Sequence, residues 1–369
     1  MRIGVDGRLW SETGVGRYIR NLTTNIERLD EKNDYFLLVK KDESENVGKF
    51  FSKSNWKIIP TDIKWHTLSE QLRFSSVLNA LDLDIMHFTY FSLPLLYSRP
   101  FIITIHDLII HHFPTGRAST LPSPLYVLKR LAYLYLIQKA ADKAEAIIAV
   151  SNSTKREIVD HLTVSQNKVK VIYEGVDKKI IGNNGKKIHD FPYILYVGNA
   201  YPHKNLNRAI AAFEIAKKKN EKFVLVGKED FFYKRLRKEI DNKGTKDVIF
   251  FGEATDGQLS NLYYHSKAYI TASLMEGFGL PPLEAMANGC FVIASNIPSI
   301  REVCQDAALY FNPYDISDIA DKIGIAFSQA DKESFISKGK ERVREFSWKK
   351  MAKETLKIYE SSIGLRQGK

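Results

Sequence analysis

Short runs of consecutive hydrophobic residues recur along the chain, separated by longer segments in which hydrophobic residues return every third or fourth position. The short runs predict strands buried on both faces, and the longer segments predict amphipathic helices. Their alternation is typical of parallel sheets covered by helices on both faces. The predicted strands are residues 2–5, 35–39, 56–59, 85–89, 101–105, 146–150, 169–173, 193–197, 223–226, 248–251, 269–272, 291–294 and 309–311.

These strands are too many for one doubly wound sheet, so the pattern predicts an α/β protein with two Rossmann-like domains. A polar stretch rich in glycine and asparagine, residues 177–190, separates the two series and is typical of a linker. We therefore predict domains over residues 1–178 and 189–346, and a final helix over residues 347–366 with Ser347 as its N-cap. Further helices are expected at residues 15–29, 153–161, 205–218, 231–242, 256–266 and 283–288.

Each candidate site follows directly after a predicted strand. In open parallel sheets, ligands bind at the carboxyl ends of the strands. We therefore expect the two domains to face each other across a central cleft that is lined by these ends.

The most specific segment joins the strand at 269–272 to the helix that follows it. Glu276 and Glu284 bracket a glycine-rich turn, and Pro281 and Pro282 suit a first helical turn, where amides need no partner. Amides at a helix start favour an anion, while the two carboxylates accept hydrogen bonds from hydroxyl groups. This combination suits a nucleotide sugar, which offers both phosphate and hydroxyls.

A second glycine-containing loop, with Gly14 and Gly16, follows the first strand and opens a helix. Its amides are candidates to approach a diphosphate, although a loop glycine more often serves the turn itself. The loop matches neither the phosphate-binding loop that ends in Lys-Ser/Thr nor the six-residue dinucleotide fingerprint.

His106 and Asp107 directly follow the strand at 101–105, a position suited to polar chemistry. The neighbouring His111 and His112 raise the alternative of a metal site, but the sequence shows no clean set of three or four ligands. Another interpretation is that His106 is a structural residue that caps the end of the strand. We favour a histidine that contacts substrate, and we expect no metal.

Lys204 stands where a helix is expected to start after the strand at 193–197. A lysine there opposes the helix dipole unless an anion binds, so Lys204 is a candidate phosphate ligand. Arg208 is four residues further on, on the same face of the expected helix, and either joins Lys204 or faces solvent.

Ser299 and Glu302 match a capping box at a helix start, and we interpret them as structural residues. Residues 125–139 are dense in Leu, Tyr and Ala around Lys129 and Arg130. They predict either a core helix or a helix whose basic, aromatic face lies on a membrane.

Composition narrows the classes of partner. The 369 residues carry a net charge of +11, spread over both halves without a basic stripe or a recognisable module, which disfavours a nucleic-acid partner. The charge suits phosphorylated ligands or an anionic membrane surface, or only a basic solvated surface. Cys290 and Cys304 form no metal-spaced cluster and are expected to be reduced and buried, as in a cytoplasmic protein. We expect neither a signal peptide nor a membrane-spanning segment.

In this order along the chain, the motifs resemble those of family 4 of the retaining GT-B glycosyltransferases, a group that includes bacterial mannosyltransferases. The resemblance covers essentially the whole chain. It rests on residues 14–17, His106-Asp107, Val150-Ser151, residues 174–177, Gly198, Lys204-Asn205, residues 276–284 and Phe346-Ser347-Trp348.

The resemblance implies a GT-B fold whose last helix returns to an N-terminal, acceptor-side domain, while the C-terminal domain binds the donor. The implied catalytic residues are His106 and Asp107, near the transferred sugar or acceptor, and Glu276, on hydroxyls of the donor sugar. Lys204 is implied to neutralise the diphosphate, and Glu284 to bind the ribose hydroxyls. The implied donor-binding residues are Gly14, Gly16, Asn199, Lys204, Arg208, Gly277, Phe278, Gly279, Leu280 and Glu284.

The sequence departs from the family at two positions. Many members carry an arginine after the glycine that is Gly198 here, whereas this chain has Asn199. The diphosphate charge is therefore expected to rest on Lys204, with help from Arg208 or another residue. Many members also carry an asparagine where this chain has Glu174.

The implied activity is retaining, metal-independent transfer of a hexosyl group to a glycan or lipid-linked acceptor in polysaccharide assembly, without a cofactor. GDP-mannose is the first choice of donor. The alternatives are another GT-B-like enzyme, such as a sugar-nucleotide epimerase or a phosphorylase, and a non-catalytic subunit that binds a nucleotide sugar. The expected location is the cytoplasm, with peripheral contact to the anionic inner face of the cell membrane.

Overall fold

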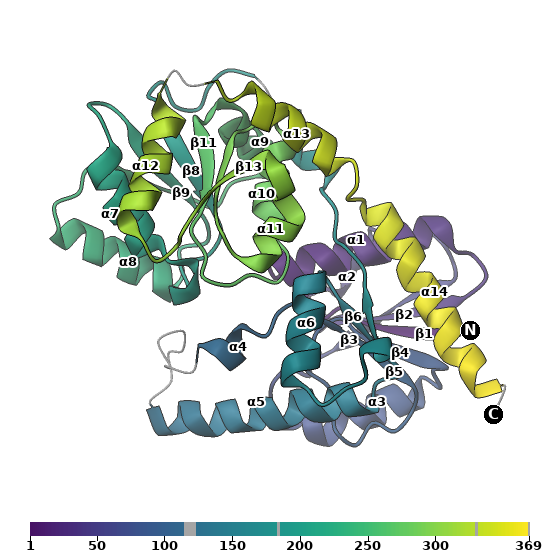
Figure 1. Cartoon of the computed structure of the whole chain (residues 1–369). Coiled ribbons are helices and arrows are strands. Elements are labelled where there is room, and N and C mark those ends of the chain that lie inside the picture. Colours follow the sequence, from purple (N-terminus) through teal and green to yellow (C-terminus); the bar gives the residue numbers. More distant parts are fainter. Residues whose placement is uncertain (114–122, 183–184, 329–330, 368–369) are drawn as a thin grey trace. The chain divides into compact units, whose positions relative to one another are not determined.

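The computed structural model describes residues 1–113, 123–182, 185–328 and 331–367 (Figure 1). The chain forms two compact units. The first unit comprises Met1–Gly175 together with Ser347–Lys369, and the second comprises Val176–Phe346.

A seven-stranded parallel sheet forms the first unit, with the strand order β3-β2-β1-β4-β5-β6-β7. The order reverses between β1 and β4, and such a switch point is where open α/β sheets bind ligands, at the carboxyl ends of the strands. The strands are β1 (Arg2–Asp6), β2 (Asp34–Lys40), β3 (Trp56–Thr61), β4 (Ile85–Phe88), β5 (Phe101–Ile105), β6 (Ala146–Ala149) and β7 (Val169–Val171).

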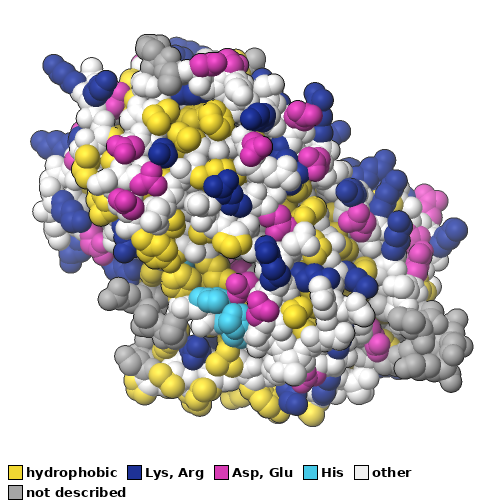
Figure 2. Space-filling view, viewed as in Figure 1, with side chains coloured by type: hydrophobic (Ala, Val, Ile, Leu, Met, Phe, Trp, Pro, Cys, Tyr) yellow, Lys and Arg dark blue, Asp and Glu magenta, His cyan; other side chains and the backbone are white. Residues whose placement is uncertain are grey.

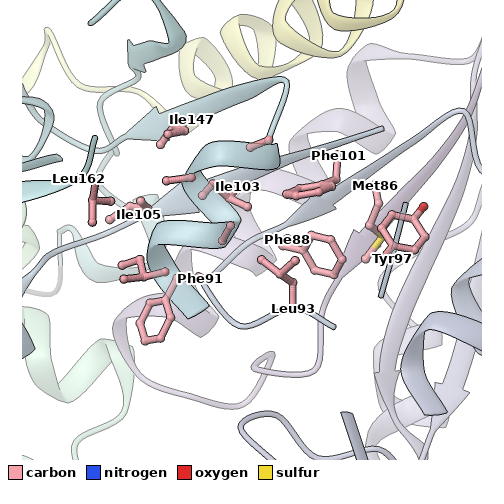
Figure 3. Close-up of a cluster of buried hydrophobic side chains, with 14 of the residues drawn as sticks. Met86, Phe88, Phe91, Leu93, Tyr97, Phe101, Ile103, Ile105, Ile147 and Leu162 are labelled. Atoms are coloured by element: carbon pink, nitrogen blue, oxygen red, sulfur yellow. The ribbon is translucent and has the colours of Figure 1, made fainter. Parts of the chain in front are cut away.

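The hydrophobic runs that predicted these strands are buried. Every residue of β4, β5 and β6 is buried, as expected for central strands covered on both faces. Figure 3 shows Phe88 of β4 with Phe101 and Ile103 of β5 in one apolar cluster. Burial of each such side chain contributes about 1.5–3 kcal/mol to stability.

Helices cover this sheet, and the last helix of the chain is one of them. Helix α14 (Trp348–Gln367) packs against α1, and its buried Tyr359 hydroxyl lies 2.7 Å from Nδ1 of His87 in β4. The return of the last helix to the first unit is therefore confirmed. The other helices of the unit are α1 (Gly14–Leu29), α2 (Ser44–Gly48), α3 (Ser75–Ala80), α4 (Ile109–His112), α5 (Ser123–Lys143) and α6 (Asn152–His161).

The outgoing and returning segments of the chain touch within the first unit. A Cβ added to Gly175 would lie 2.4 Å from the amide nitrogen of Trp348 and 2.8 Å from the carbonyl carbon of Ser347. Only glycine allows this close approach of two backbones.

The second unit repeats the same architecture with a six-stranded parallel sheet of order β10-β9-β8-β11-β12-β13. Its strands are β8 (Tyr193–Val197), β9 (Lys222–Val226), β10 (Val248–Gly252), β11 (Ala268–Thr271), β12 (Val292–Ser295) and β13 (Ala308–Phe311). Its helices are α7 (Leu206–Ala216), α8 (Phe231–Asn242), α9 (Asp256–His265), α10 (Leu280–Ala287), α11 (Pro298–Cys304), α12 (Ile316–Phe327) and α13 (Glu333–Val343).

The sequence predicted the two parallel Rossmann-like sheets correctly, but one helix start was wrong. Helix α11 begins at Pro298 after an extended Ile297, and no side chain caps it. Ser299 is therefore inside the first turn, where it cannot act as an N-cap, because a proline with its fixed φ already starts the helix. Both cysteines are free and buried, as expected. In the described part of the chain, no helix is long and apolar enough to cross a membrane.

Candidate active site

The turn between β11 and α10 has the geometry that its glycines and prolines predicted. Gly279 has φ +117°, a left-handed conformation that side chains disfavour, and a Cβ there would lie 2.8 Å from Cδ1 of Ile300. Helix α10 begins at Leu280, with Pro281 and Pro282 in its first turn. Because prolines carry no amide hydrogen, hydrogen-bond donors at this helix start are confined to Leu280 and the turn before it.

Glu276 of this turn is paired with Lys204. The Nζ atom of Lys204 lies 2.6 Å from Oε1 of Glu276, and the Ser273 hydroxyl donates to the same oxygen at 2.6 Å. Both charged side chains are mostly buried, with 17% and 16% of their surfaces exposed. The structure thus brings together two predicted site residues that are 72 positions apart in the sequence.

Electrostatics keep the carboxyl group of Glu276 ionised. Burial alone would raise the pKa of the Glu276 carboxyl, but the charge of Lys204 and the hydrogen bonds to the carboxylate lower it on balance. Burial and the charge of Lys204 lower the pKa of His203 to about 4, so His203 is neutral at pH 7. Glu276 is therefore a carboxylate that only accepts hydrogen bonds, as a ligand for sugar hydroxyls requires.

Asn205 fixes the position of Lys204. Lys204 ends a 3₁₀ turn, Pro202–Lys204, and Asn205 follows with φ +60°. Asn tolerates this left-handed conformation better than most residues. Its side-chain amide donates to the carbonyl oxygens of Ala272 at 3.1 Å and Pro313 at 2.8 Å, which ties the lysine turn to the end of β11.

One expectation about this region was wrong. Helix α7 begins at Leu206, one residue after the expected start, so Lys204 precedes the helix and shares no helical face with Arg208. The guanidinium of Arg208 donates to Oδ1 of Asn205 at 3.0 Å and lies over the ring of Tyr314. The sequence missed this arrangement because the left-handed Asn205 interrupts an otherwise helical pattern.

The remaining predicted donor-binding residues of the second unit have separate surroundings. Oδ1 of Asn199 accepts the amide of Tyr201 at 3.3 Å. Glu284, inside α10, is buried and accepts the Tyr263 hydroxyl at 3.2 Å. Phe278 is buried with its ring edge on Phe346, and Gly277 lies in the turn itself.

In the first unit, Gly14 and Gly16 differ in their packing. Both lie in the first turn of α1. A Cβ on Gly16 would lie 2.5 Å and 2.8 Å from the carbonyl oxygens of Trp10 and Leu9, whereas a Cβ on Gly14 would meet no atom within 4 Å. Gly16 is thus required for close backbone packing, and Gly14 borders open space.

His106 is held from both sides at the carboxyl end of β5. Its Nδ1 lies 3.4 Å from Oε1 of Glu174, and its Nε2 lies 3.1 Å from the carbonyl oxygen of Thr89. The edge of the Tyr18 ring also contacts the imidazole. Asp107 accepts the amide of Ile109 at 3.0 Å, so it orders the start of α4.

Sequence reasoning missed Glu174 and Ser273 as members of these clusters. The sequence offered one indication for Glu174, since many family members have an asparagine at this position. The structure shows that the glutamate side chain reaches the imidazole of His106. For Ser273, the only signal was its position just after a strand.

Comparisons with known proteins cover both units. Residues 13–179 match the family model described as Glycosyltransferase Family 4, and residues 177–342 match that described as Glycosyl transferases group 1. The O-antigen chain mannosyltransferase RfbU of Salmonella typhimurium is 27% identical over 68% of this chain and 67% of the relative. O-antigen chain mannosyltransferase B of Escherichia coli is 24% identical over 94% of this chain and 96% of the relative. The crystal structure of Anabaena HepE in complex with UDP-glucose has a TM-score of 0.75 at 16% identity, over 98% of this chain and 100% of that one, which shows a shared fold.

Proposed function

Because this chain belongs to glycosyltransferase family 4 and has the GT-B fold, we propose that it transfers a mannosyl group from GDP-mannose to a glycan or lipid-linked saccharide during polysaccharide assembly. The choice of mannose and of polysaccharide assembly is supported by the two relatives, both O-antigen chain mannosyltransferases. A nucleoside-diphosphate sugar as donor is supported by the structural relative, which binds UDP-glucose.

The observation that carries this proposal is the contact of Lys204 with Glu276 beside the start of α10. A nucleoside diphosphate that leaves a sugar gains negative charge, which a mostly buried ammonium group stabilises far better than water does. The adjacent carboxylate is a hydroxyl acceptor for the sugar ring. One cation and one anion 2.6 Å apart thus match the junction of phosphate and sugar in the donor.

The proposed reaction keeps the configuration at the anomeric carbon. The bond from this carbon to the diphosphate oxygen breaks, and the acceptor hydroxyl oxygen forms a new bond on the same face. The hydroxyl proton passes to the departing diphosphate, so charge and atoms balance. Lys204 takes the place that a metal ion has in other transferases, since it neutralises the leaving group without one.

A transfer assay with the purified chain tests this proposal. GDP-mannose is supplied with and without a mannose-containing acceptor, and UDP-mannose and GDP-glucose serve as matched donors that change only the base or only the sugar. The proposal expects GDP and a lengthened acceptor only when GDP-mannose and acceptor are both present. Release of GDP at equal rates without acceptor, or an isomerised donor, would point to a hydrolase or an epimerase instead.

We also propose that α5 places the first unit on an anionic membrane surface. One face of this helix is buried through Tyr133 and Ile137, while Leu128, Leu131 and Tyr135 on another face are 66%, 56% and 57% exposed. In Figure 2, hydrophobic side chains gather along the lower edge, over α5. The exposed Lys129 adds positive charge among them. Exposed apolar side chains with a nearby cation are typical of a surface that meets lipid headgroups.

Co-sedimentation with vesicles tests this contact. Vesicles with anionic phosphatidylglycerol should retain the protein, and the variant Leu128→Glu/Leu131→Glu should stay in the supernatant with an unchanged melting temperature. Ile215→Glu, at an exposed apolar residue of the second unit, is the matched control and should still bind. Equal retention of all three proteins would contradict a role of α5.

A further inference from the structure

Two histidines and a glutamate converge on the surface of the first unit, outside the candidate active site. Nε2 of His112 lies 2.5 Å from Oε2 of Glu157, and Nε2 of His161 lies 3.4 Å from the same oxygen. One ligand atom from each residue lies within 4.8 Å of the other two. The sequence indicated His112 only as one of two neighbouring histidines, because Glu157 and His161 follow about 45 residues later.

We infer that His112, Glu157 and His161 form a binding site for Zn²⁺ or a similar divalent transition metal. Two imidazole nitrogens and one carboxylate oxygen are a ligand set of zinc sites, with a fourth position left for water. Tetrahedral bonds of about 2.0–2.2 Å place ligand atoms roughly 3.3–3.5 Å apart. The distances between the ligand atoms in the structure lie on both sides of this spacing. Small side-chain rotations would therefore bring all three atoms to bonding distance from one ion.

Two of the three ligands lie on one helix at a spacing that brings their side chains together. Glu157 and His161 are four residues apart on α6, so they lie on the same helical face one turn apart. His112 is the last residue of the short helix α4. His111 is directed elsewhere, since its Nδ1 lies 3.1 Å from the Tyr133 hydroxyl. The ligand set is therefore His112, Glu157 and His161, without His111.

A bound ion would fasten α4 to α6. Helix α4 directly follows His106 and Asp107, and Asp107 orders its first residue through the amide of Ile109. The ion would thus restrain the segment behind two candidate catalytic residues without contacting them. Such an ion would act through the position of α4, and its binding is independent of the proposed donor and of the sugar-transfer chemistry.

Isothermal titration of the chelator-treated full chain with ZnCl₂ tests this inference. We expect one Zn²⁺ per chain and a higher melting temperature with the ion. Glu157→Gln and His161→Asn should each weaken zinc binding by about 10–100-fold or more. Loss of a residue that only hydrogen-bonds to a metal ligand already lowers metal affinity by about 10–100-fold. Asp160→Asn removes an exposed carboxylate of the same helix outside the ligand set, and should bind as the native chain does.

Three results would overturn the inference: no zinc binding to the native chain, equal affinity in the ligand variants, or equal loss in Asp160→Asn. In the first case, an ordinary ion pair between histidine and Glu157 accounts for the contacts. Hydrogen exchange gives a second measurement, since zinc should slow exchange of the Phe113 amide, which bonds to Ile109 at the end of α4. No nucleotide sugar is present in these experiments, so their failure leaves the proposed transferase activity untouched.

Discussion

Glu174 positions His106: its Oε1 lies 3.4 Å from Nδ1 of the imidazole, and both side chains are nearly buried, with 5% and 11% of their surfaces exposed. The carbonyl oxygen of Thr89 faces the other ring nitrogen. The imidazole is therefore fixed in orientation at the end of β5, as a group that contacts a substrate must be.

Glu174→Ala should reduce kcat by roughly 10–100-fold, because a reacting group displaced by about 1 Å loses up to about 100-fold in rate. The donor KM should change little, since Glu174 acts through His106 and not through the donor-binding candidates Lys204 and Glu276. Steady-state kinetics measure both. Glu174→Asn, which restores the residue of many family members, is the control and should keep more activity than Glu174→Ala; the reverse order would remove the positioning role.

Lys204→Ala should weaken binding of GDP by roughly 10–100-fold, the range expected for loss of a charge-assisted hydrogen bond of about 1.5–3 kcal/mol. Calorimetry with GDP measures it directly. Glu276→Gln keeps the size of the side chain and should lower kcat severely while GDP still binds. Unchanged GDP affinity in Lys204→Ala would mean that the diphosphate is held elsewhere.

The same two residues should be coupled in stability. Each single substitution leaves one mostly buried charge without its partner, at a cost of about 1–3 kcal/mol, so Lys204→Ala/Glu276→Gln should be less destabilised than the sum of the single variants. Urea unfolding of the four proteins gives the coupling energy. Additive effects would indicate that the contact contributes nothing to the free energy of unfolding.

Gly16→Ala should destabilise the first unit by about 1–3 kcal/mol, because its Cβ would overlap two backbone oxygens that cannot easily move. Gly14→Ala is the matched control in the same helical turn. It should be neutral or stabilising by up to about 1 kcal/mol, since alanine favours helices and has space there. Equal stability of the two variants in urea would contradict the packing role of Gly16.

Stability should fall on acidification below about pH 6.5. Burial lowers the pKa of His87 to about 3 and, together with Lys204, that of His203 to about 4. In the unfolded chain both histidines take up protons near pH 6.5, whereas the folded chain binds none until pH falls much further, so protons favour unfolding. The loss approaches about 1.4 kcal/mol per pH unit for each histidine. Melting temperatures from pH 7.5 to 5 test this, and His87→Gln should flatten the dependence.

Sugar transfer should persist in EDTA, because the leaving diphosphate is assigned to Lys204. Removal of zinc from the site at His112, Glu157 and His161 should lower the melting temperature without stopping transfer. Activity assays and thermal unfolding in the same buffers separate the two effects. Complete loss of transfer in EDTA, restored by a divalent ion, would make the reaction metal-dependent.

The fold was predictable because buried parallel strands leave a direct signature of continuous hydrophobic runs, as in β4, β5 and β11. The turn at Gly279 was predictable because glycine and the prolines restrict the backbone locally. The lysine turn was not, since it depends on the left-handed Asn205 and on its bonds to residues 67 and 108 positions away. The contact of Glu174 with His106 likewise depends on how β5 and the segment after β7 pack, which no local pattern encodes.

The contact of Gly175 with Trp348 has a consequence for how the protein is made. Residues 176–346 are an insertion between two parts of one folding unit, and those parts meet only when α14 has been synthesised. On the ribosome, β1–β7 of the first unit are synthesised before the inserted unit, but α14 is synthesised last, so the surface of α1 that it covers stays exposed until then. Chains truncated before residue 348 should therefore expose apolar surface and aggregate, even though β1–β13 of the two sheets are all present.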